Sequence, residues 1–262
     1  MLKKLLKYDL KWCYKVLGVF YILSIFFSIL ARIFGSMEKT LMVTIVNNIL
    51  LGILITMIVN ILINSLMRNW VRFRTNIYGD ESYLTHTLPV SRNKIYLSKI
   101  ITGILVLITS FIVILISLAI AYLNEDTGII LKNIMERQSI LFNCSVNTLV
   151  MVMILTIFFE ILFMYMSGIL GMIIGHKSNN LKIVKTISIG ILVYMIFSSM
   201  SVGILYVVGF LNPEIMAIFN TSNVSSNSLK QTMIVGIVIY FVYNLVIYFY
   251  GNKILNKGVN ID

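Results

Sequence analysis

Long apolar runs alternate with short polar segments along nearly the whole chain. Each of six runs is long enough to cross a bilayer as a helix, because about 20 apolar residues span its hydrocarbon. We predict spanning helices at about 16–34, 41–67, 100–123, 146–175, 186–211 and 233–250. The pattern therefore predicts an all-α membrane protein. Residues 1–262 would form a single membrane domain, since no separate soluble domain of ordinary size fits between the runs.

The first 15 residues have a different pattern, with two stripes at helical spacing. The apolar stripe consists of Leu2, Leu6, Leu10, Cys13 and Leu17, and the basic stripe of Lys4, Lys7, Lys11 and Lys15. Such a pattern is typical of an amphipathic helix in the membrane interface. A signal peptide is the alternative, but no clear small-residue cleavage site follows the apolar run, so we expect an anchor.

Composition and charge agree with a membrane protein. The chain is 59% hydrophobic and 12% charged, whereas soluble proteins average about 45–50% apolar and about 25% charged residues. Of the 21 Lys and Arg residues, sixteen fall on the side of the N-terminus in the six-span topology and five on the other. The positive-inside rule then predicts a multi-pass protein of the cell membrane with both termini cytoplasmic. One-sided charge explains the net +11 without a nucleic-acid partner.

Motifs for catalysis or for metal binding are absent from the sequence. Cys13 and Cys144 are predicted on opposite faces of the membrane, so we expect no disulfide and no metal site. The segment Gly175–Ser178 lacks the spacing of a phosphate-binding loop, and neither a His-Glu-x-x-His nor a Gly-x-Ser-x-Gly motif occurs. We expect no enzyme activity and no cofactor in this chain.

Glu160 lies near the middle of the predicted fourth span. An ionised carboxylate there costs about 3 kcal/mol unless it is paired, hydrated or protonated. Two interpretations remain open. Glu160 is either a gating or substrate-contacting residue, or it forms a structural hydrogen bond with Asn47, Asn60 or Asn64 of the second span.

Two other sets of residues in the spans indicate helix packing. Asn60 and Asn64 lie one turn apart, so both amides face one way and are expected to join helices. Ser167, Gly171 and Gly175 form a ridge of small residues that permits close helix approach, within the subunit or across a dimer.

A short helix is predicted before the last span. Asn212 is a good N-cap, Pro213 suits the first turn, and Glu214 lies near the positive end of the helix dipole. We expect this helix to extend to Phe219 and to be too short to span.

The segment 70–99 is the longest part of the chain that is unsuited to hydrocarbon. Gly79 can end one helix, and Asp80 can cap a short helix over 81–87, which Leu88-Pro89 terminates. Ser91 would cap the extension of the third span.

An apolar knob is expected on this short helix, formed by Tyr83, Leu84 and Leu88. One interpretation is that the knob docks into a groove of a partner protein. The other is that the helix lies on lipid headgroups, held by nearby basic residues. These are Arg72, Arg74, Arg92 and Lys94.

The segment contains the run Tyr78-Gly-Asp-Glu-Ser-Tyr-Leu-Thr-His-Thr-Leu-Pro-Val-Ser91, followed by Ser98-Lys99. This run resembles the first cytoplasmic loop of permease subunits of bacterial ABC-2 type exporters. The resemblance implies a coupling-type helix between spans 2 and 3, a second permease subunit in a homo- or heterodimer, and a separate ABC ATPase that hydrolyses ATP. It also implies that Glu81, Tyr83, Leu84 and Leu88 contact the ATPase. Members of the family export drugs, antimicrobial peptides, lipids and polysaccharides, and these residues do not choose among them.

Two other functions compete with a permease. A membrane sensor or immunity subunit would bind an antimicrobial peptide without moving it. A proton-coupled secondary transporter would use Glu160 as its coupling carboxylate. A neighbouring ATPase gene favours the permease, whereas transport without any ATPase favours the secondary transporter.

Overall fold

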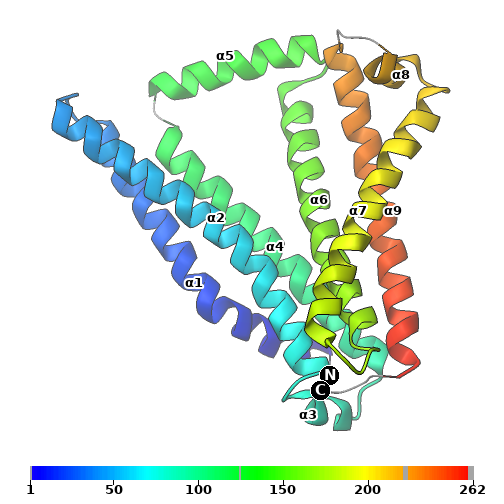
Figure 1. Cartoon of the computed structure of the whole chain (residues 1–262). Helices are drawn as coiled ribbons and strands as arrows, with labels where there is room; N and C mark the ends of the chain where they lie inside the picture. Colours follow the sequence, from blue (N-terminus) through cyan, green and yellow to red (C-terminus); the bar gives the residue numbers. More distant parts are fainter. Residues whose placement is uncertain (1, 124, 221–223, 259–262) are drawn as a thin grey trace. The chain divides into compact units, whose positions relative to one another are not determined.

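The computed structural model describes residues 2–123, 125–220 and 224–258 (Figure 1). Within these ranges all regular secondary structure is helical, which confirms the all-α prediction. The long helices are α1 (Leu2–Gly35), α2 (Leu41–Ile77), α4 (Arg92–Tyr122), α6 (Val146–Gly175), α7 (Lys182–Gly209) and α9 (Ser226–Asn256). The shorter helices are α3 (Ser82–Thr87), α5 (Glu125–Leu141) and α8 (Pro213–Asn220).

The six long helices are those whose length and composition suit a membrane span. They coincide with the six predicted runs, so the prediction of a multi-pass membrane protein is supported. Several helices extend beyond the apolar residues that revealed them: α2 continues to Ile77, and α9 begins at Ser226. Neither extension contains a proline, so the backbone hydrogen bonds of the helix continue into polar sequence.

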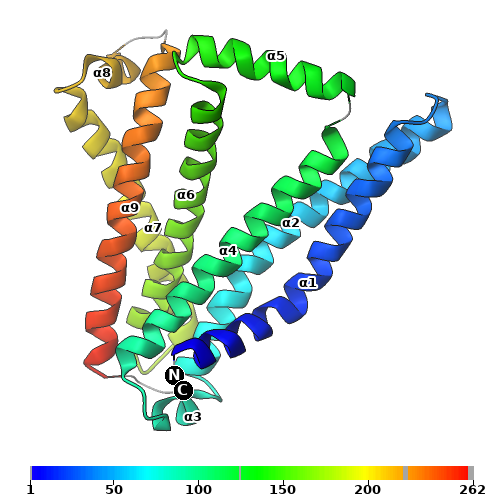
Figure 2. The same cartoon turned by 180° about the vertical axis from the view of Figure 1, so that it is seen from behind.

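The predicted interfacial helix and the first span are one continuous helix, α1. In Figure 2 the first turns of α1 are inclined to its remainder. The basic stripe is exposed along these turns, as its spacing predicts, while Cys13 and Leu17 are buried. The placement of these turns in a membrane interface stays a prediction.

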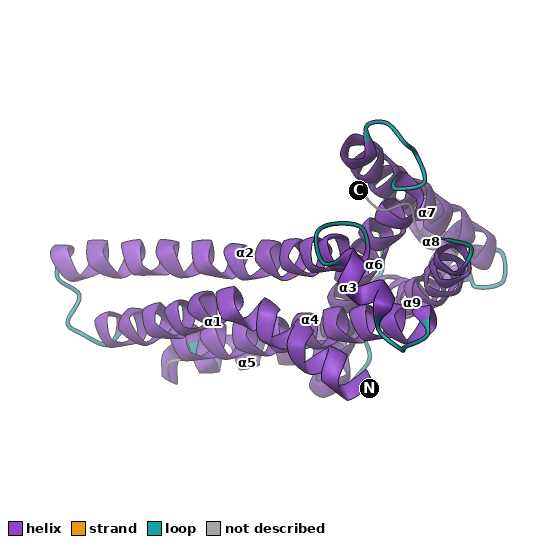
Figure 3. Cartoon of the chain, turned by 90° about the horizontal axis from the view of Figure 1, so that it is seen from below, coloured by secondary structure: helices purple, strands orange, loops and turns teal. Residues whose placement is uncertain are grey.

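The chain divides into two compact units, Met1–Leu131 and Lys132–Asp262. In the first unit α1 packs along both α2 and α4, and α2 also contacts α4 (Figure 3). Cys13, Leu17 and Val106 form a buried apolar cluster between α1 and α4. Three hydrogen bonds join the same two helices: Tyr14 with Thr109 (2.9 Å), Tyr21 with Ser110 (2.7 Å) and Ser117 with Ser24 (3.2 Å).

In the second unit the small residues of α6 pack against α7. A Cβ atom added to Gly171 would lie 2.6 Å from the Gly190 Cα, and one added to Gly175 would lie 2.7 Å from the Thr186 Cα. A Cβ added to Gly190 would lie 3.6 Å from the Ser167 carbonyl oxygen. The ridge therefore packs within the subunit, which was one of the two expected uses.

Helix α8 confirms the predicted short helix before the last span. The Asn212 side chain accepts a hydrogen bond from the Glu214 backbone N–H (3.1 Å), as an N-cap does. The Glu214 carboxylate in turn accepts hydrogen bonds from Ser225 (3.2 Å) and Ser228 (3.0 Å) at the start of α9. Helix α8 is thereby fixed to the first turn of the last span.

Helix α5 is an element that the hydropathy pattern did not predict. It follows α4 and includes the ion pair Lys132–Glu136, whose atoms lie 3.9 Å apart one turn along an exposed surface. The exposed side chains of Ile130 and Ile134 interrupt its polar sequence. Such a mixed pattern is neither a spanning run nor a clean amphipathic stripe, so periodicity alone did not reveal the helix.

Candidate functional site

The chain reverses direction between α2 and α3 through three backbone hydrogen bonds. The Gly79 N–H donates to the Arg74 carbonyl (3.0 Å), the Glu81 N–H to the Thr75 carbonyl (3.2 Å), and the Ser82 N–H to the Gly79 carbonyl (2.8 Å). Gly79 thus helps to end α2, as predicted. The turn holds the start of α3 against the last turn of α2.

The predicted cap of α3 is wrong by one residue. The N-cap position is held by Glu81 instead of Asp80, and its side chain makes no capping hydrogen bond. The Glu81 carboxylate is directed toward α2 instead, where it binds two side chains. Ser91 holds the N-cap position of α4 as predicted, also without a side-chain capping bond.

One side of α3 is buried and the other is exposed. Ser82 and Thr85 are buried, and a ring nitrogen of His86 lies 3.1 Å from the Ile77 carbonyl oxygen. On the other side Tyr83, Leu84 and Leu88 have 69%, 73% and 43% of their surface exposed. We call these three residues the α3 knob. Their exposure agrees with the apolar knob expected from the sequence.

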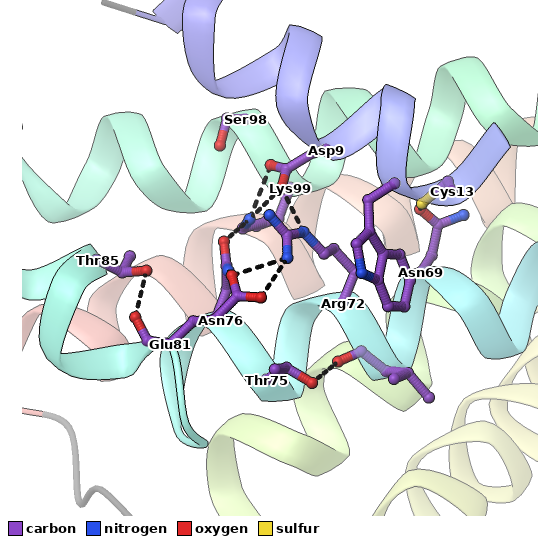
Figure 4. A network of polar contacts seen from close by, with 12 residues as sticks. Asp9, Cys13, Asn69, Arg72, Thr75, Asn76, Glu81, Thr85, Ser98 and Lys99 are labelled. Carbon is purple, nitrogen blue, oxygen red and sulfur yellow. Dashed lines mark hydrogen bonds and ion pairs between the residues drawn. The ribbon is translucent and has the colours of Figure 1, made fainter. Parts of the chain in front are cut away.

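Glu81, at the start of α3, belongs to a cluster of charged and amide side chains, which we call the Asp9 cluster (Figure 4). Lys99 donates to both Asp9 carboxylate oxygens at 2.7 Å, and the Arg72 Nε lies 2.8 Å from Asp9 Oδ1. Arg72 also binds Glu81 through its Nη1 at 2.8 Å. Asn76 completes the cluster by donating to Glu81 and accepting from Lys99.

The Asp9 cluster joins four segments that are distant in the sequence. Asp9 comes from α1, Arg72 and Asn76 from α2, Glu81 from the N-cap of α3, and Lys99 from α4. Its two cations and two carboxylates balance, so its formal charge is zero. Asp9 and Lys99 are only 2% and 4% exposed, Arg72 is 12% exposed, and Glu81 is 42% exposed. The cluster therefore runs from a buried ion pair to the surface beside the knob.

Aromatic residues enclose the cationic side of this cluster. The Arg68 guanidinium carbon lies 3.9 Å from the centre of the Trp12 ring, and the Arg72 carbon lies 5.5 Å from it. Both distances suit cation–π attraction, which strengthens when the cation is shielded from water. Phe73 is buried nearby on α2 and packs against the rings of Tyr78 and Tyr96. Both guanidinium groups therefore lie within cation–π range of the Trp12 ring.

Sequence reasoning did not reveal the cluster. Arg72 was considered only in the alternative in which basic residues hold the short helix on lipid headgroups, and Lys99 only as part of the run that resembles ABC-2 permeases, whereas the structure shows both bound to Asp9. Asp9 itself was not singled out. A signal was present, because Asp9 lies three residues after Leu6 and four before Cys13, on the apolar stripe of the N-terminal helix. An acid on that stripe indicates a buried partner.

The predicted intramembrane residues fall in both units. Asn60 and Asn64 lie on α2, where their amides donate to the Thr56 and Asn60 carbonyls of their own helix, each at 2.9 Å. Their predicted role in joining helices stays a prediction. Glu160 lies on α6 in the second unit and is half-buried. Both interpretations of Glu160 remain predictions.

Comparisons of the chain with models of known protein families, with curated proteins and with solved structures found no match. In the part of the chain that the structure describes, the fold is that of an α-helical protein with six candidate membrane spans. A more specific function is a matter of proposal, and the resemblance of the loop to ABC-2 permeases is one of its supports.

Proposed function

We propose that this chain is the permease subunit of an ATP-driven exporter of the ABC-2 type, and that the α3 knob docks onto a separate ATPase subunit. The observation that carries the proposal is the arrangement of α3. Its apolar side chains Tyr83, Leu84 and Leu88 are exposed, while Glu81 at its first turn binds the Asp9 cluster. A rigidly held apolar knob suits docking into a groove of another protein.

The Asp9 cluster gives the knob a mechanical connection to the spans. A displacement of α3 acts on Glu81, whose carboxylate is bound to Arg72 and Asn76 of α2. Through Arg72 and Asp9 the displacement reaches α1, and through Lys99 it reaches α4. Three helices that are candidate spans would therefore respond together when the ATPase closes on its nucleotide. In this proposal Glu81 transmits the movement, and the knob makes the contact.

The distribution of charge supports binding of the ATPase on the cytoplasmic side of the membrane. The segment that carries α3 belongs to the side with sixteen of the 21 Lys and Arg residues, which the positive-inside rule assigns to the cytoplasm. The proposal thus includes cytoplasmic termini, a location in the cell membrane, and a second permease subunit that completes a translocation path as a homo- or heterodimer.

The test is co-purification of the chain with its ATPase after the substitution Leu84→Asp. A charge in the centre of an apolar contact should abolish the association, because the carboxylate would lose its water without gaining a partner. Leu181→Asp is the matched control. Leu181 is exposed to a similar extent, 71% against 73%, lies on the same predicted side, and has a positive φ of 55° that Asp tolerates.

The proposal requires that Leu84→Asp loses the ATPase while Leu181→Asp retains it, with both variants inserted in the membrane at wild-type amounts. Equal co-purification of the two variants would show that the knob is not the docking site. Transport by the chain in vesicles that contain no ATPase would instead favour a secondary transporter.

A further inference from the structure

Glu160 lies at a depth where a free carboxylate is unfavourable. With a rise of about 1.5 Å per residue, it is about 20 Å from either end of α6 (Val146–Gly175). A helix of this length crosses the hydrocarbon, so Glu160 is near the centre of the bilayer if α6 spans it. An ionised side chain at such a depth requires a counter-charge, water or a proton.

The chain itself offers no cation at that depth. Within the described residues of its own unit, 132–220 and 224–258, none forms a hydrogen bond or an ion pair with the Glu160 carboxylate. Five of the six predicted apolar runs contain neither Lys nor Arg, and Arg32 of the first run lies in the last turn of α1. A cation from another molecule would supply the counter-charge that these runs lack.

Aromatic side chains surround this part of α6. Phe163, one turn after Glu160, contacts rings of α7 and α9, with centroid distances of 5.5 Å to Tyr194, 5.4 Å to Tyr240 and 5.8 Å to Tyr243. Tyr240 also lies within electrostatic reach of the Glu160 carboxylate. On the other side of Glu160 in the sequence, Phe159 contacts Phe241 of α9 at 5.9 Å. Aromatic faces attract organic cations, most strongly away from water.

Polar atoms without partners lie on two of these helices, α7 and α9. The Tyr243 hydroxyl, the Asn244 side-chain oxygen and the Ser198 hydroxyl are buried and make no hydrogen bond to any described residue. Tyr243 and Asn244 are on α9, and Ser198 follows the aromatic Phe197 on α7, whose ring lies 4.7 Å from that of Tyr243. Buried polar atoms without a partner are uncommon, and these three retain the capacity to hydrogen-bond with water or a ligand.

We propose that Glu160 and the aromatic residues beside it form an intramembrane binding site for a lipophilic organic cation. The carboxylate supplies the counter-charge, and Tyr240 supplies an aromatic face next to it. Glu160 is half-buried, so part of this residue stays uncovered and open to a ligand. The inference goes beyond ATP-driven export and does not depend on it, because binding requires only the chain.

The test measures binding of radiolabelled tetraphenylphosphonium to the full chain in phosphatidylcholine nanodiscs, with empty nanodiscs as the blank. We expect saturable binding to the wild-type chain. Glu160→Gln should weaken this binding at least about tenfold, because the uncharged amide cannot balance the cation. Tyr240→Leu retains apolar bulk without an aromatic face and should weaken it about threefold to tenfold.

The matched control is Glu136→Gln, which makes the same charge change on the exposed surface of α5 and should leave binding unchanged. Tetraphenylborate has the size and shape of the probe with the opposite charge, so Glu160→Gln should not weaken its binding. The proposal fails if the wild-type chain binds no more tetraphenylphosphonium than empty nanodiscs, or if the two glutamine variants behave alike. If Glu160→Gln unfolds in the same transition as the wild-type chain, its loss of binding is not caused by loss of the fold.

Discussion

Asp9→Asn should be among the most destabilising isosteric changes in the chain. The substitution removes a negative charge without altering the shape of the side chain. Lys99 and Arg72, which are 4% and 12% exposed, would then have only the Glu81 carboxylate nearby as a counter-charge. Removing one partner of a buried ion pair costs about 3–5 kcal/mol, because the remaining charge stays desolvated. This is a large part of a typical unfolding free energy of about 5–15 kcal/mol.

Reversible unfolding by SDS in mixed micelles measures this cost. The chain has two tryptophans, Trp12 and Trp70, and both lie in the unit that contains the Asp9 cluster. Their fluorescence therefore reports the unfolding of that unit. Asp9→Leu combined with Lys99→Met should recover part of the loss, since apolar residues of similar volume often replace a buried ion pair at little cost.

Glu136→Gln provides the comparison, because it breaks an ion pair that is exposed. Lys132 and Glu136 are 76% and 52% exposed and 3.9 Å apart, so their pair is worth about 0.3–0.5 kcal/mol. Glu136 lies in the other compact unit, so its variant should leave the tryptophan transition unchanged. If Asp9→Asn shifts that transition no more than Glu136→Gln does, the buried cluster does not hold the first unit together.

Two further predictions concern the second unit. Gly171→Ala should destabilise it by about 1–3 kcal/mol, since the new Cβ would lie 2.6 Å from the Gly190 Cα. Gly236→Ala, with no atom within 4 Å of its Cβ, should instead stabilise α9 by up to about 1 kcal/mol. Thermal unfolding that ranks the two variants the other way contradicts this packing. Hydrogen bonds from Ser228, Asn227 and Ser225 lower the pKa of Glu214 below 4.5, so the stabilisation is present above that pH and is lost as the pH falls through the folded value. The protection of α8 against hydrogen exchange, corrected for the intrinsic exchange rate at each pH, should therefore fall on acidification in the wild-type chain and depend less on pH in Glu214→Gln. Identical protection profiles would show that these bonds do not stabilise α8.

Hydropathy was sufficient to predict the six long helices, because a run of about 20 apolar residues has few alternatives to a spanning helix. Helix α8 was equally predictable from Asn212, Pro213 and Glu214, whose capping roles are local. The ridge of Gly171 and Gly175 indicated a close helix contact, and the structure supplied its partner, α7. Each of these features is encoded within a few turns of one helix.

The Asp9 cluster could not be predicted in the same way. Asp9 and Lys99 are 90 positions apart, and nothing local distinguishes Lys99 from the basic residues that precede it. The packing of α1, α2 and α4 brings them together. Glu81 was selected for its place in the loop, but its carboxylate binds α2. Side-chain direction at a helix terminus depends on neighbours from other segments, which the sequence pattern does not identify.

The most direct test of the proposed function is photo-crosslinking from position 84. A benzoylphenylalanine introduced in place of Leu84, which is 73% exposed, reacts with whatever covers the knob in cell membranes. The proposal predicts a covalent adduct with a soluble subunit that hydrolyses ATP, identified by mass spectrometry, and no such adduct from position 181. Adducts with lipid alone would contradict docking and favour a helix that lies on the headgroups.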